Sequence, residues 1–241
     1  MHQWCGMRKK LFIWPVMALF SIYLLAGYSN AEKSGAGSGP SYYALTPEGF
    51  GSYAPSNRTL DFKNIDYPLL HAAICFEINR ARTSHGKQLL VHSEALEKAA
   101  FLHSRSMARQ SFFAHTDPYD PKRGSPHQRM ALAGVHGGIT AENIAMAFGI
   151  QYKDGSPVIP PRGGDGPFRE YKTGAVIPHH TYRSFAVAVV DGWMHSAGHR
   201  ANILDGRLKF MGSGASFFED RNFYRMPTFT VTLDLSSHAQ E

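Results

Sequence analysis

Apolar positions in the middle of the chain recur with the spacing of an α-helix. Leu70, Ile74 and Ile78 lie four residues apart, and Pro68 suits the first turn of the helix that they predict. A second helix should begin after the N-cap Ser93, because one stripe follows it, formed by Leu96, Ala99, Ala100, His103 and Met107. Two more helices are expected, from Ser125 to Gly134 and from about Tyr182 to Ala197, with Gly198 as the stop of the last one.

The C-terminal part of the chain has the period of a β-strand instead. Apolar residues from Phe229 to Leu235 alternate with threonines and Asp234, which predicts a half-buried strand. Residues Met211 to Phe218 predict the strand before it, with glycines where another backbone comes close. Helices first and strands later favour an α+β domain built in layers.

The N-terminus carries the pattern of an export signal. Arg8, Lys9 and Lys10 precede an uncharged apolar run, and Ser29-Asn30-Ala31 offers small residues for cleavage. Residues 1–31 are therefore expected to be a secretory signal peptide or, alternatively, an uncleaved N-terminal anchor. In either case the rest of the chain is expected outside the cytoplasm.

Two segments lack any sustained periodicity. Residues 32–62 are rich in glycine, serine, proline and tyrosine, which predicts a flexible tether. Residues of about 148–180 are rich in glycine and proline and end in Pro178-His179-His180, which predicts a long irregular insertion. The folded domain is then expected over residues 63–241.

Composition and charge narrow the classes of protein. Hydrophobic residues make up 43% of the chain and can form a core, while 14 prolines exclude a coiled coil. Without residues 1–31, 22 basic residues remain against 19 acidic ones, and this net charge of +3 is too small to indicate nucleic-acid binding. Cys5 lies in the signal region, so Cys75 is expected to be a buried structural thiol without a disulfide partner.

The common nucleotide-binding, zinc-protease and nucleophile-elbow motifs are absent from the sequence. Three other segments combine ionisable residues with helix-end signals, namely Phe113-Ala114-His115-Thr116-Asp117, Ala141-Glu142-Asn143-Ile144-Ala145, and Trp193-Met194-His195-Ser196-Ala197-Gly198-His199-Arg200-Ala201-Asn202-Ile203-Leu204. Such ends are where a rigid scaffold presents chemical groups.

These three segments resemble signature stretches of the bacterial branch of the CAP superfamily, the SCP-like or PR-1-like domains. They are similar to its Phe-Ser-His-Thr, Gly-Glu-Asn-Ile-Ala and Trp-Met-Asn-Ser-Pro-Gly-His-Arg-Ala-Asn-Ile-Leu elements, and they occur in the family's order. The resemblance covers residues of about 68–235. The chain departs from the pattern at Ala141, which replaces glycine, and at Ala197, which replaces proline.

The resemblance implies a three-layer α-β-α sandwich with a central surface cleft. In the family this cleft carries two histidines and two acidic groups, which bind a divalent metal in some members. By position the cleft residues here are His115, Glu142 and His199, and Ser196 stands where the second acidic group is found. His115 and His199 are accordingly the expected metal ligands, with zinc or another divalent ion as the expected cofactor.

The residue types allow three kinds of chemistry at this site. Two imidazoles and a carboxylate suit zinc with an open position for water. Without metal, Glu142 could hold a histidine in one tautomer and leave its other nitrogen as a base. Alternatively, the three groups form a buried polar network that joins chain segments. Ser196 with His199 as nucleophile and base, and His195 with His199 as metal ligands, are weaker candidates.

The expected function is that of an exported binding or interaction module. Its ligand would be a lipid, a glycan or a peptide held at the His115 and Glu142 cleft. The alternative is a metal-dependent or His/Glu-dependent hydrolase that acts on peptides outside the cytoplasm, and a third hypothesis is a structural protein of the cell envelope. No membrane span is expected beyond the possible N-terminal anchor.

Overall fold

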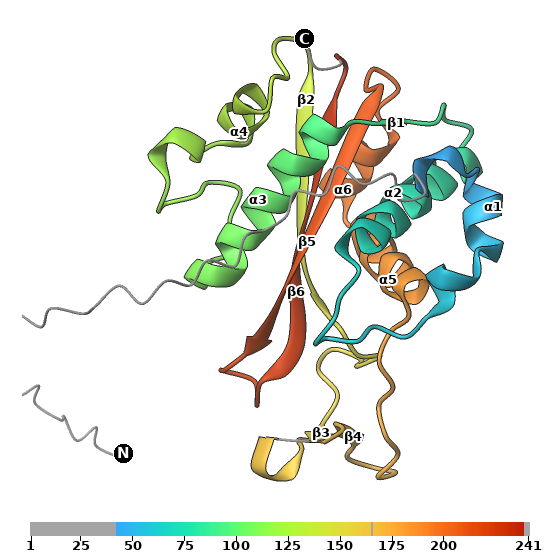
Figure 1. The fold of residues 1–241 in the computed structure, drawn as a ribbon, viewed down its shortest axis with the longest axis vertical. Coiled ribbons are helices and arrows are strands. Elements are labelled where there is room, and N and C mark those ends of the chain that lie inside the picture. The colour runs from blue at the N-terminus through green and yellow to red at the C-terminus, as the bar shows by residue number, and fades with distance from the viewer. Residues whose placement is uncertain (1–41, 165, 239–241) are drawn as a thin grey trace, which may run out of the picture. The chain divides into compact units, whose positions relative to one another are not determined.

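A four-stranded sheet lies between two layers of helices (Figure 1). The protein is described as a computed structural model, which covers residues 42–164 and 166–238. The expected signal peptide or anchor at 1–31 lies outside the described residues.

The helices are α1 (Pro47–Ser52), α2 (Tyr67–Ser84), α3 (Glu94–Gln110), α4 (Pro126–Leu132), α5 (Tyr182–His195) and α6 (Ala197–Leu204), with short 3-10 turns at Tyr42–Ala44, Ala54–Asn57, Pro121–Arg123 and Arg162–Gly164. The strands are β1 (Val91–His92), β2 (Thr140–Phe148), β3 (Val158–Ile159), β4 (Arg169–Glu170), β5 (Phe210–Asp220) and β6 (Met226–Ser236).

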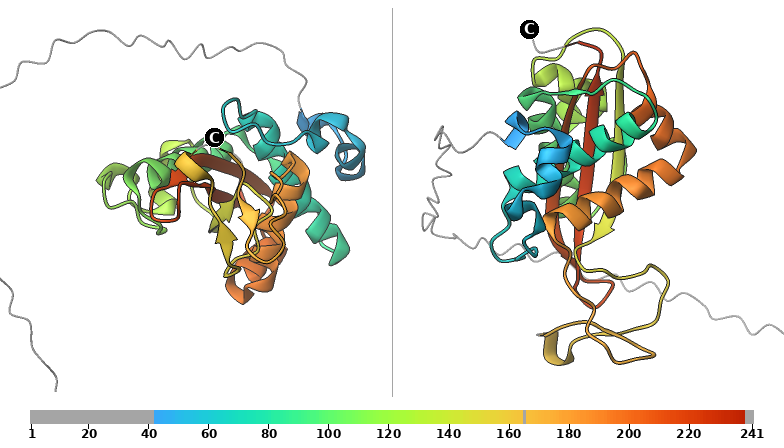
Figure 2. Two further views of the ribbon diagram at one scale, coloured as in Figure 1. Left: turned by 90° about the horizontal axis from the view of Figure 1, so that it is seen from below. Right: turned by 90° about the vertical axis from the view of Figure 1, so that its right-hand side faces the viewer.

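The main sheet has the strand order β1-β5-β6-β2. β1 is parallel to β5, whereas β5 with β6 and β6 with β2 are antiparallel. α3 and α4 cover one face of the sheet and α2 and α5 cover the other (Figures 1 and 2). The α+β class and the three-layer sandwich expected from the sequence are confirmed.

The final strand is central, so the prediction of a half-buried strand is wrong. Its threonines face α3 and are as deeply buried as the apolar residues between them. Thr230 Oγ1 donates to the carbonyl of Ser104 at 2.7 Å, and Ser104 Oγ donates to Thr232 Oγ1 at 2.9 Å. Since each hydroxyl finds a partner, a strand with a polar face can lie inside the protein.

α3 packs directly on β5 because two positions of this strand carry no side chain. A Cβ atom at Gly212 would overlap the α3 backbone at Glu97, and one at Gly214 would overlap it at Phe101. The glycines of the predicted strand 211–218 therefore mark a close backbone approach, as the sequence indicated.

The predicted helix starts are confirmed, but the prediction that Gly198 ends the last helix is wrong. Ser93 and Ser125 cap α3 and α4 through their side chains. Gly198, expected as a stop, lies in the first turn of α6. The break occurs at Ser196, whose extended backbone ends α5 and begins α6. His199 therefore lies near an N-terminus rather than at a helix C-cap.

Three further expectations need correction. The Glu142 segment, which was expected at a helix end, lies instead within the strand Thr140–Phe148. Residues 42–62 are not a flexible tether, because Phe50 and Leu60 belong to the main apolar core. The irregular 148–180 segment contains a small two-stranded sheet and shares an apolar cluster of Ile150, Phe168, Ile177 and Met226.

Cys75 is a buried thiol, as expected. It is 1% exposed, and burial raises its pKa to about 12. At neutral pH the sulfur is therefore protonated and is no nucleophile.

Over residues 42–164 and 166–238, no helix is long and apolar enough to cross a membrane.

We expect Gly214→Ala to lower the free energy of unfolding by about 3 kcal/mol, since the added methyl group forces α3 away from the sheet. Gly206→Ala is the matched control, because its Cβ would meet no atom within 4 Å and should change stability little. Urea unfolding of both variants tests this. Equal midpoints for Gly214→Ala and wild type would contradict the close packing of α3 on β5.

Candidate functional site

The outer edge of β2 is held by side chains from α5 and α6. Trp193 Nε1 donates to the carbonyl of Ile144 at 3.1 Å. Asn202 Nδ2 donates to Asn143 Oδ1 at 2.9 Å, and Asn143 Nδ2 donates to the carbonyl of His199 at 3.1 Å. The asparagines of two signature segments thus bind each other and fix the start of α6 beside β2.

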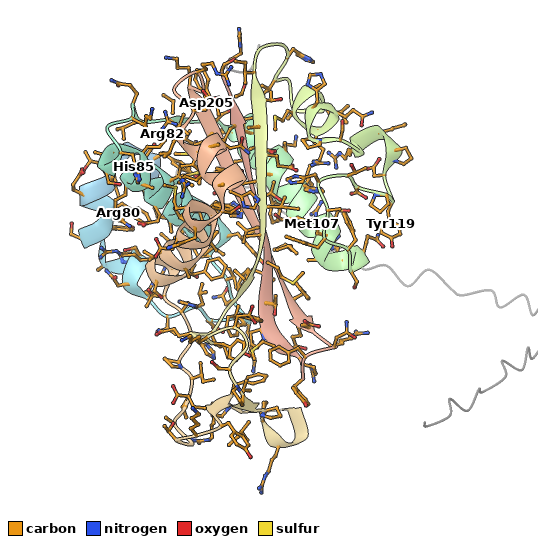
Figure 3. All side chains as sticks on the ribbon, turned by 180° about the vertical axis from the view of Figure 1, so that it is seen from behind. Arg80, Arg82, His85, Met107, Tyr119 and Asp205 are labelled. Atoms are coloured by element: carbon orange, nitrogen blue, oxygen red, sulfur yellow. The ribbon has the colours of Figure 1, made fainter. Side chains whose placement is uncertain are left out.

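The other end of α6 is fixed by Arg82, at the end of α2 (Figure 3). This guanidinium is fully buried and donates to the carbonyls of Ile203 at 2.6 Å, Asp205 at 3.1 Å and Gln88 at 2.7 Å. Since α6 is anchored at both ends, the position of His199 is set by the scaffold.

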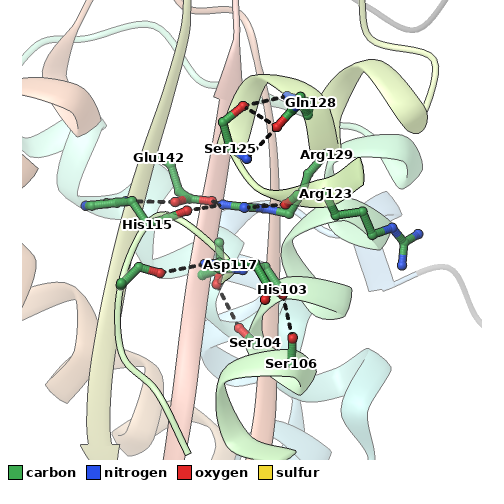
Figure 4. Close-up of polar contacts among 12 residues, drawn as sticks. His103, Ser104, Ser106, His115, Asp117, Arg123, Ser125, Gln128, Arg129 and Glu142 are labelled. Carbon is green, nitrogen blue, oxygen red and sulfur yellow. Dashed lines mark hydrogen bonds and ion pairs between the residues drawn. The ribbon is translucent and has the colours of Figure 1, made fainter. Parts of the chain in front are cut away.

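His115 and Glu142 form the centre of the candidate site (Figure 4). His115 Nδ1 lies 2.7 Å from Glu142 Oε1. The imidazole is 50% exposed, whereas the carboxylate is 2% exposed. Because a carboxylate accepts hydrogen bonds, Nδ1 is the donor, and in its neutral form the ring presents an unprotonated Nε2.

Arg129 of α4 holds Glu142 from its other side. Its Nη2 lies 2.6 Å from Glu142 Oε2 and donates to the carbonyl of His115 at 2.9 Å. Its Nη1 donates to the carbonyls of Arg123 and Gly124. One guanidinium therefore fixes the carboxylate, the His115 loop and the turn before α4 together. Each oxygen of Glu142 has a cationic or imidazole partner.

Asp234 of β6 lies opposite Glu142 in the sheet. The carbonyl of Ile144 binds Trp193 and therefore points away from β6. Glu142, two residues earlier in β2, has the same backbone orientation, so Glu142 and Asp234 form a non-hydrogen-bonded pair of the two strands. The side chains of such a pair approach each other closely. Asp234 is 0% exposed, and no donor of the described chain reaches its oxygens. Burial, and then the charge of Glu142, raise the pKa of Asp234 well above its ordinary value. These effects favour the protonated form of Asp234, whose O–H can donate to the facing carboxylate of Glu142.

His103 of α3 supports the loop that carries His115. Its Nε2 donates to the carbonyl of Ala114 at 3.0 Å. Burial, and then the charge of Arg129, lower the pKa of His103, so its ring is neutral at pH 7. On the same loop, Asp117 accepts from Ser106 Oγ at 2.5 Å and from the amide of Tyr119 at 2.9 Å.

His199 lies near enough to His115 for the charge of that imidazole to affect its pKa. Burial, and then the charge that His115 can carry, lower the pKa of His199, so this imidazole is neutral at pH 7. Ser196 lies between α5 and α6 and makes no side-chain capping bond. His195 is exposed, and its Nδ1 binds the carbonyl of Asp191 at 2.7 Å. Of the expected residues, His115 and Glu142 are in direct contact, and His199 is near enough to respond to the charge of His115.

The donor set fits a three-ligand zinc site poorly. Catalytic zinc sites use three protein ligands and a water. In residues 42–164 and 166–238, no group of three His, Cys, Asp or Glu side chains is placed to hold a metal ion. Glu142 already binds His115 and Arg129, so its geometry is that of a carboxylate that orients a histidine. Two imidazoles remain available.

A surface groove begins close to this site. It has a volume of about 620 Å³ and lies between the end of α3 and the β5–β6 hairpin. Phe113, two residues before His115, and Met146, on the same face of β2 as Glu142, both line it and are about half exposed. Its walls therefore combine aromatic and apolar side chains with a polar rim.

Sequence reasoning missed Arg129, Asp234 and His103. Asp234 offered a signal, because it is the charged residue in an otherwise uncharged alternating strand. A buried acid needs a partner, which would have directed attention to Glu142 once β6 was known to be central. Arg129 gave no signal, since an arginine in a short helix is ordinarily exposed.

A three-layer sandwich that presents a histidine–glutamate pair beside its edge strand is an SCP-like domain. The chain belongs to the CAP family, because the model of the Cysteine-rich secretory protein family matches residues 76–234. A search of curated proteins found no match.

Three solved structures are similar to this chain. An extracellular protein with an SCP domain from Bacillus anthracis is 21% identical with a TM-score of 0.46, and the match covers 81% of this chain and 44% of that one. An outer surface protein of Borrelia burgdorferi is 14% identical with a TM-score of 0.43, and the match covers 77% of this chain and 99% of that one. A cysteine-rich secretory protein of Staphylococcus aureus is 14% identical with a TM-score of 0.42, and the match covers 72% of this chain and 40% of that one. The chain thus spans less than half the length of the first and third structures.

Asp234→Asn should make the protein more stable at pH 8 than wild type. The folded-state pKa of Asp234 is raised, so wild type loses stability as pH rises from about 4 through that pKa, by up to about 1.4 kcal/mol per pH unit. The amide does not titrate and can still donate to Glu142. Urea unfolding at pH 4.5 and pH 8 should show the difference widening with pH.

Asp191→Asn, at an exposed position of α5, is the matched control and should follow wild type at both pH values. A constant difference between Asp234→Asn and wild type from pH 4.5 to pH 8 would contradict a protonated Asp234.

Proposed function

We propose that this CAP domain is an exported binding module whose site at the edge of β2 binds the polar group of a small or lipidic ligand. The observation that carries the proposal is the engagement of Glu142 from both sides, by His115 and by Arg129. A carboxylate held in this way orients the imidazole and is not itself free to bind a ligand. The group offered to a ligand is the half-exposed ring of His115.

The orientation of His115 indicates which ligand group fits. Its Nε2 is a hydrogen-bond acceptor, since Nδ1 donates to Glu142. The neutral His199 beside it can accept or donate. A hydroxyl or an amide N–H is therefore the best partner, as found in sterols, glycans and peptides. The neighbouring groove with Phe113 and Met146 would take the apolar part of such a molecule.

Export is part of the proposal. It is supported by the basic and apolar pattern of residues 1–31 and by the secretory name of the matching family. A module of this kind would work outside the cytoplasm or in the cell envelope. Zinc or another divalent ion enters the proposal only as a weak ligand of His115 and His199, because two imidazoles leave two tetrahedral positions without protein donors.

The second candidate function is a hydrolase, and the His115–Glu142 pair favours it. An unprotonated Nε2 backed by a carboxylate is the arrangement of a general base. His115 would take a proton from water as the water attacks a carbonyl group, and Glu142 would stabilise the imidazolium that forms. Binding and hydrolysis use the same nitrogen, so turnover distinguishes them.

We expect His115→Gln and His199→Gln to keep the fold and to lose ligand binding. The probes are a soluble sterol with a free hydroxyl, its ester, a β-linked oligosaccharide, a short peptide and zinc chloride, and binding of each is followed by thermal unfolding. A bound probe should raise the Tm of wild type, and the shift should fall by more than half in either variant. His195→Gln is the matched control, since His195 is exposed and its Nδ1 binds the carbonyl of Asp191 in its own helix.

A shift that survives His115→Gln unchanged would overturn the placement of the ligand. Release of product from the ester or the peptide by wild type, abolished in His115→Gln, would establish the hydrolase instead.

A further inference from the structure

Three arginines surround a small cup on the side of α3 that faces away from the sheet. Arg105 and Arg109 lie one turn apart on α3, and Arg123 comes from the 3-10 turn Pro121–Arg123. The cup has a volume of about 200 Å³. Figure 4 shows the Arg123 side chain extending away from the Arg129–Glu142 pair. The cup is a different hollow from the His115 site, although His103, Asp117 and Arg129, which support that site, also line the cup.

The guanidinium groups of these arginines lack a carboxylate partner among the described residues. Within residues 42–164 and 166–238, none of the three forms an ion pair or donates a side-chain hydrogen bond, whereas Arg80, Arg207 and Arg225 are all paired with carboxylates. Arg105 stacks on the ring of Phe101 at 5.6 Å, which fixes the plane of its guanidinium and leaves its N–H groups free.

Two of the three unpaired cations are partly buried. Arg105 and Arg123 are neither fully exposed nor enclosed, while Arg109 is exposed at the rim. A half-buried guanidinium without a partner gives up hydration without gaining an ion pair, and this is unfavourable unless a ligand supplies the acceptor.

The acidic groups of the cup are already used. Asp117 accepts hydrogen bonds from Ser106 and from the amide of Tyr119, and Asp120 caps the amide of Lys122. Arg129 is neutralised by Glu142. With Arg129 balanced by Glu142, the three guanidinium groups outnumber the two carboxylates by one positive charge, and Lys122 lies next to Arg123 in the chain.

We propose that this cup binds a phosphate group. A carboxylate has two oxygens and is satisfied by one arginine, whereas a tetrahedral phosphate offers oxygens to several guanidinium forks at once. Arginines from α3 and from the Pro121–Arg123 turn surround the cup, so they can contact different oxygens of one phosphate. The proposal is independent of the His115 site and goes beyond the binding function proposed for it.

The phosphate can be free or carried by a lipid headgroup. The surroundings of the cup include Tyr119 at 60% exposure, on the loop between Asp117 and Asp120, and Leu132 at 61% exposure, which lies with Arg123 along a neighbouring hollow. Exposed apolar side chains beside arginines are typical of contact with an anionic membrane surface. Both sources share the phosphate chemistry, and the experiment separates them.

The test uses the triple variant Arg105→Gln, Arg109→Gln, Arg123→Gln. Its matched control is Lys153→Gln, Arg162→Gln, Lys172→Gln, which removes three cations from the 148–180 segment. Calorimetric titration measures the affinity for inorganic phosphate at low salt. Cosedimentation measures binding to vesicles of phosphatidylcholine with and without phosphatidic acid. Circular dichroism verifies folding, and Arg109→Gln alone, at the exposed rim, serves where the triple variant fails to fold.

We expect phosphate affinity to fall at least about tenfold in the triple variant and to stay within about twofold of wild type in the control. Binding only to vesicles with phosphatidic acid, lost in the triple variant and kept in the control, supports the site with a lipid as its source. Equal losses in the triple variant and the control would show a general charge effect and overturn the proposal. Absence of binding to both phosphate and vesicles would overturn it as well.

Discussion

The position of the candidate site depends on one buried ion pair, between Arg129 and Glu142. The guanidinium reaches the carboxylate at 2.6 Å, and both side chains are 2% exposed. Such a pair adds little net stability, because both charges lose their hydration, but losing one partner costs about 3–5 kcal/mol. Its physical role is to fix positions. Through its carbonyl contacts Arg129 joins α4, the turn before it and the His115 loop to β2.

The sheet makes such a pair possible by offering a polar interior on one face. β6 places threonines toward α3, and Asp234 continues this row up to Glu142. A second ionised carboxylate beside Glu142 would be buried next to a like charge, and both effects raise the pKa of Asp234. The buried side of the site is thus a closed network, and only the imidazole side faces solvent. This arrangement favours the proposal that a ligand is bound through His115 rather than through Glu142.

The sequence predicted those features that local chemistry determines. Helix starts followed from capping residues such as Ser93 and Ser125, and the glycines of β5 correctly indicated close backbone contact. Tertiary contacts decided the rest. Gly198 did not stop a helix, because the extended backbone of Ser196 had already ended α5. The segment of residues 42–62 has no periodicity and packs all the same, because Phe50 and Leu60 fill the core. Three site residues came from the signature segments, whereas Arg129 and Asp234 required the folded neighbourhood of Glu142.

The protonation site of His115 tests this account most directly. Long-range nitrogen–proton NMR correlation of the histidine side chains at pH 8 identifies which ring nitrogen carries the proton. We expect His115 to carry its proton at Nδ1, since the carboxylate of Glu142 accepts there and is held by Arg129. A spectrum with the His115 proton on Nε2, or with the two forms exchanging freely, would contradict the orienting role of Glu142 and the ligand chemistry inferred from it.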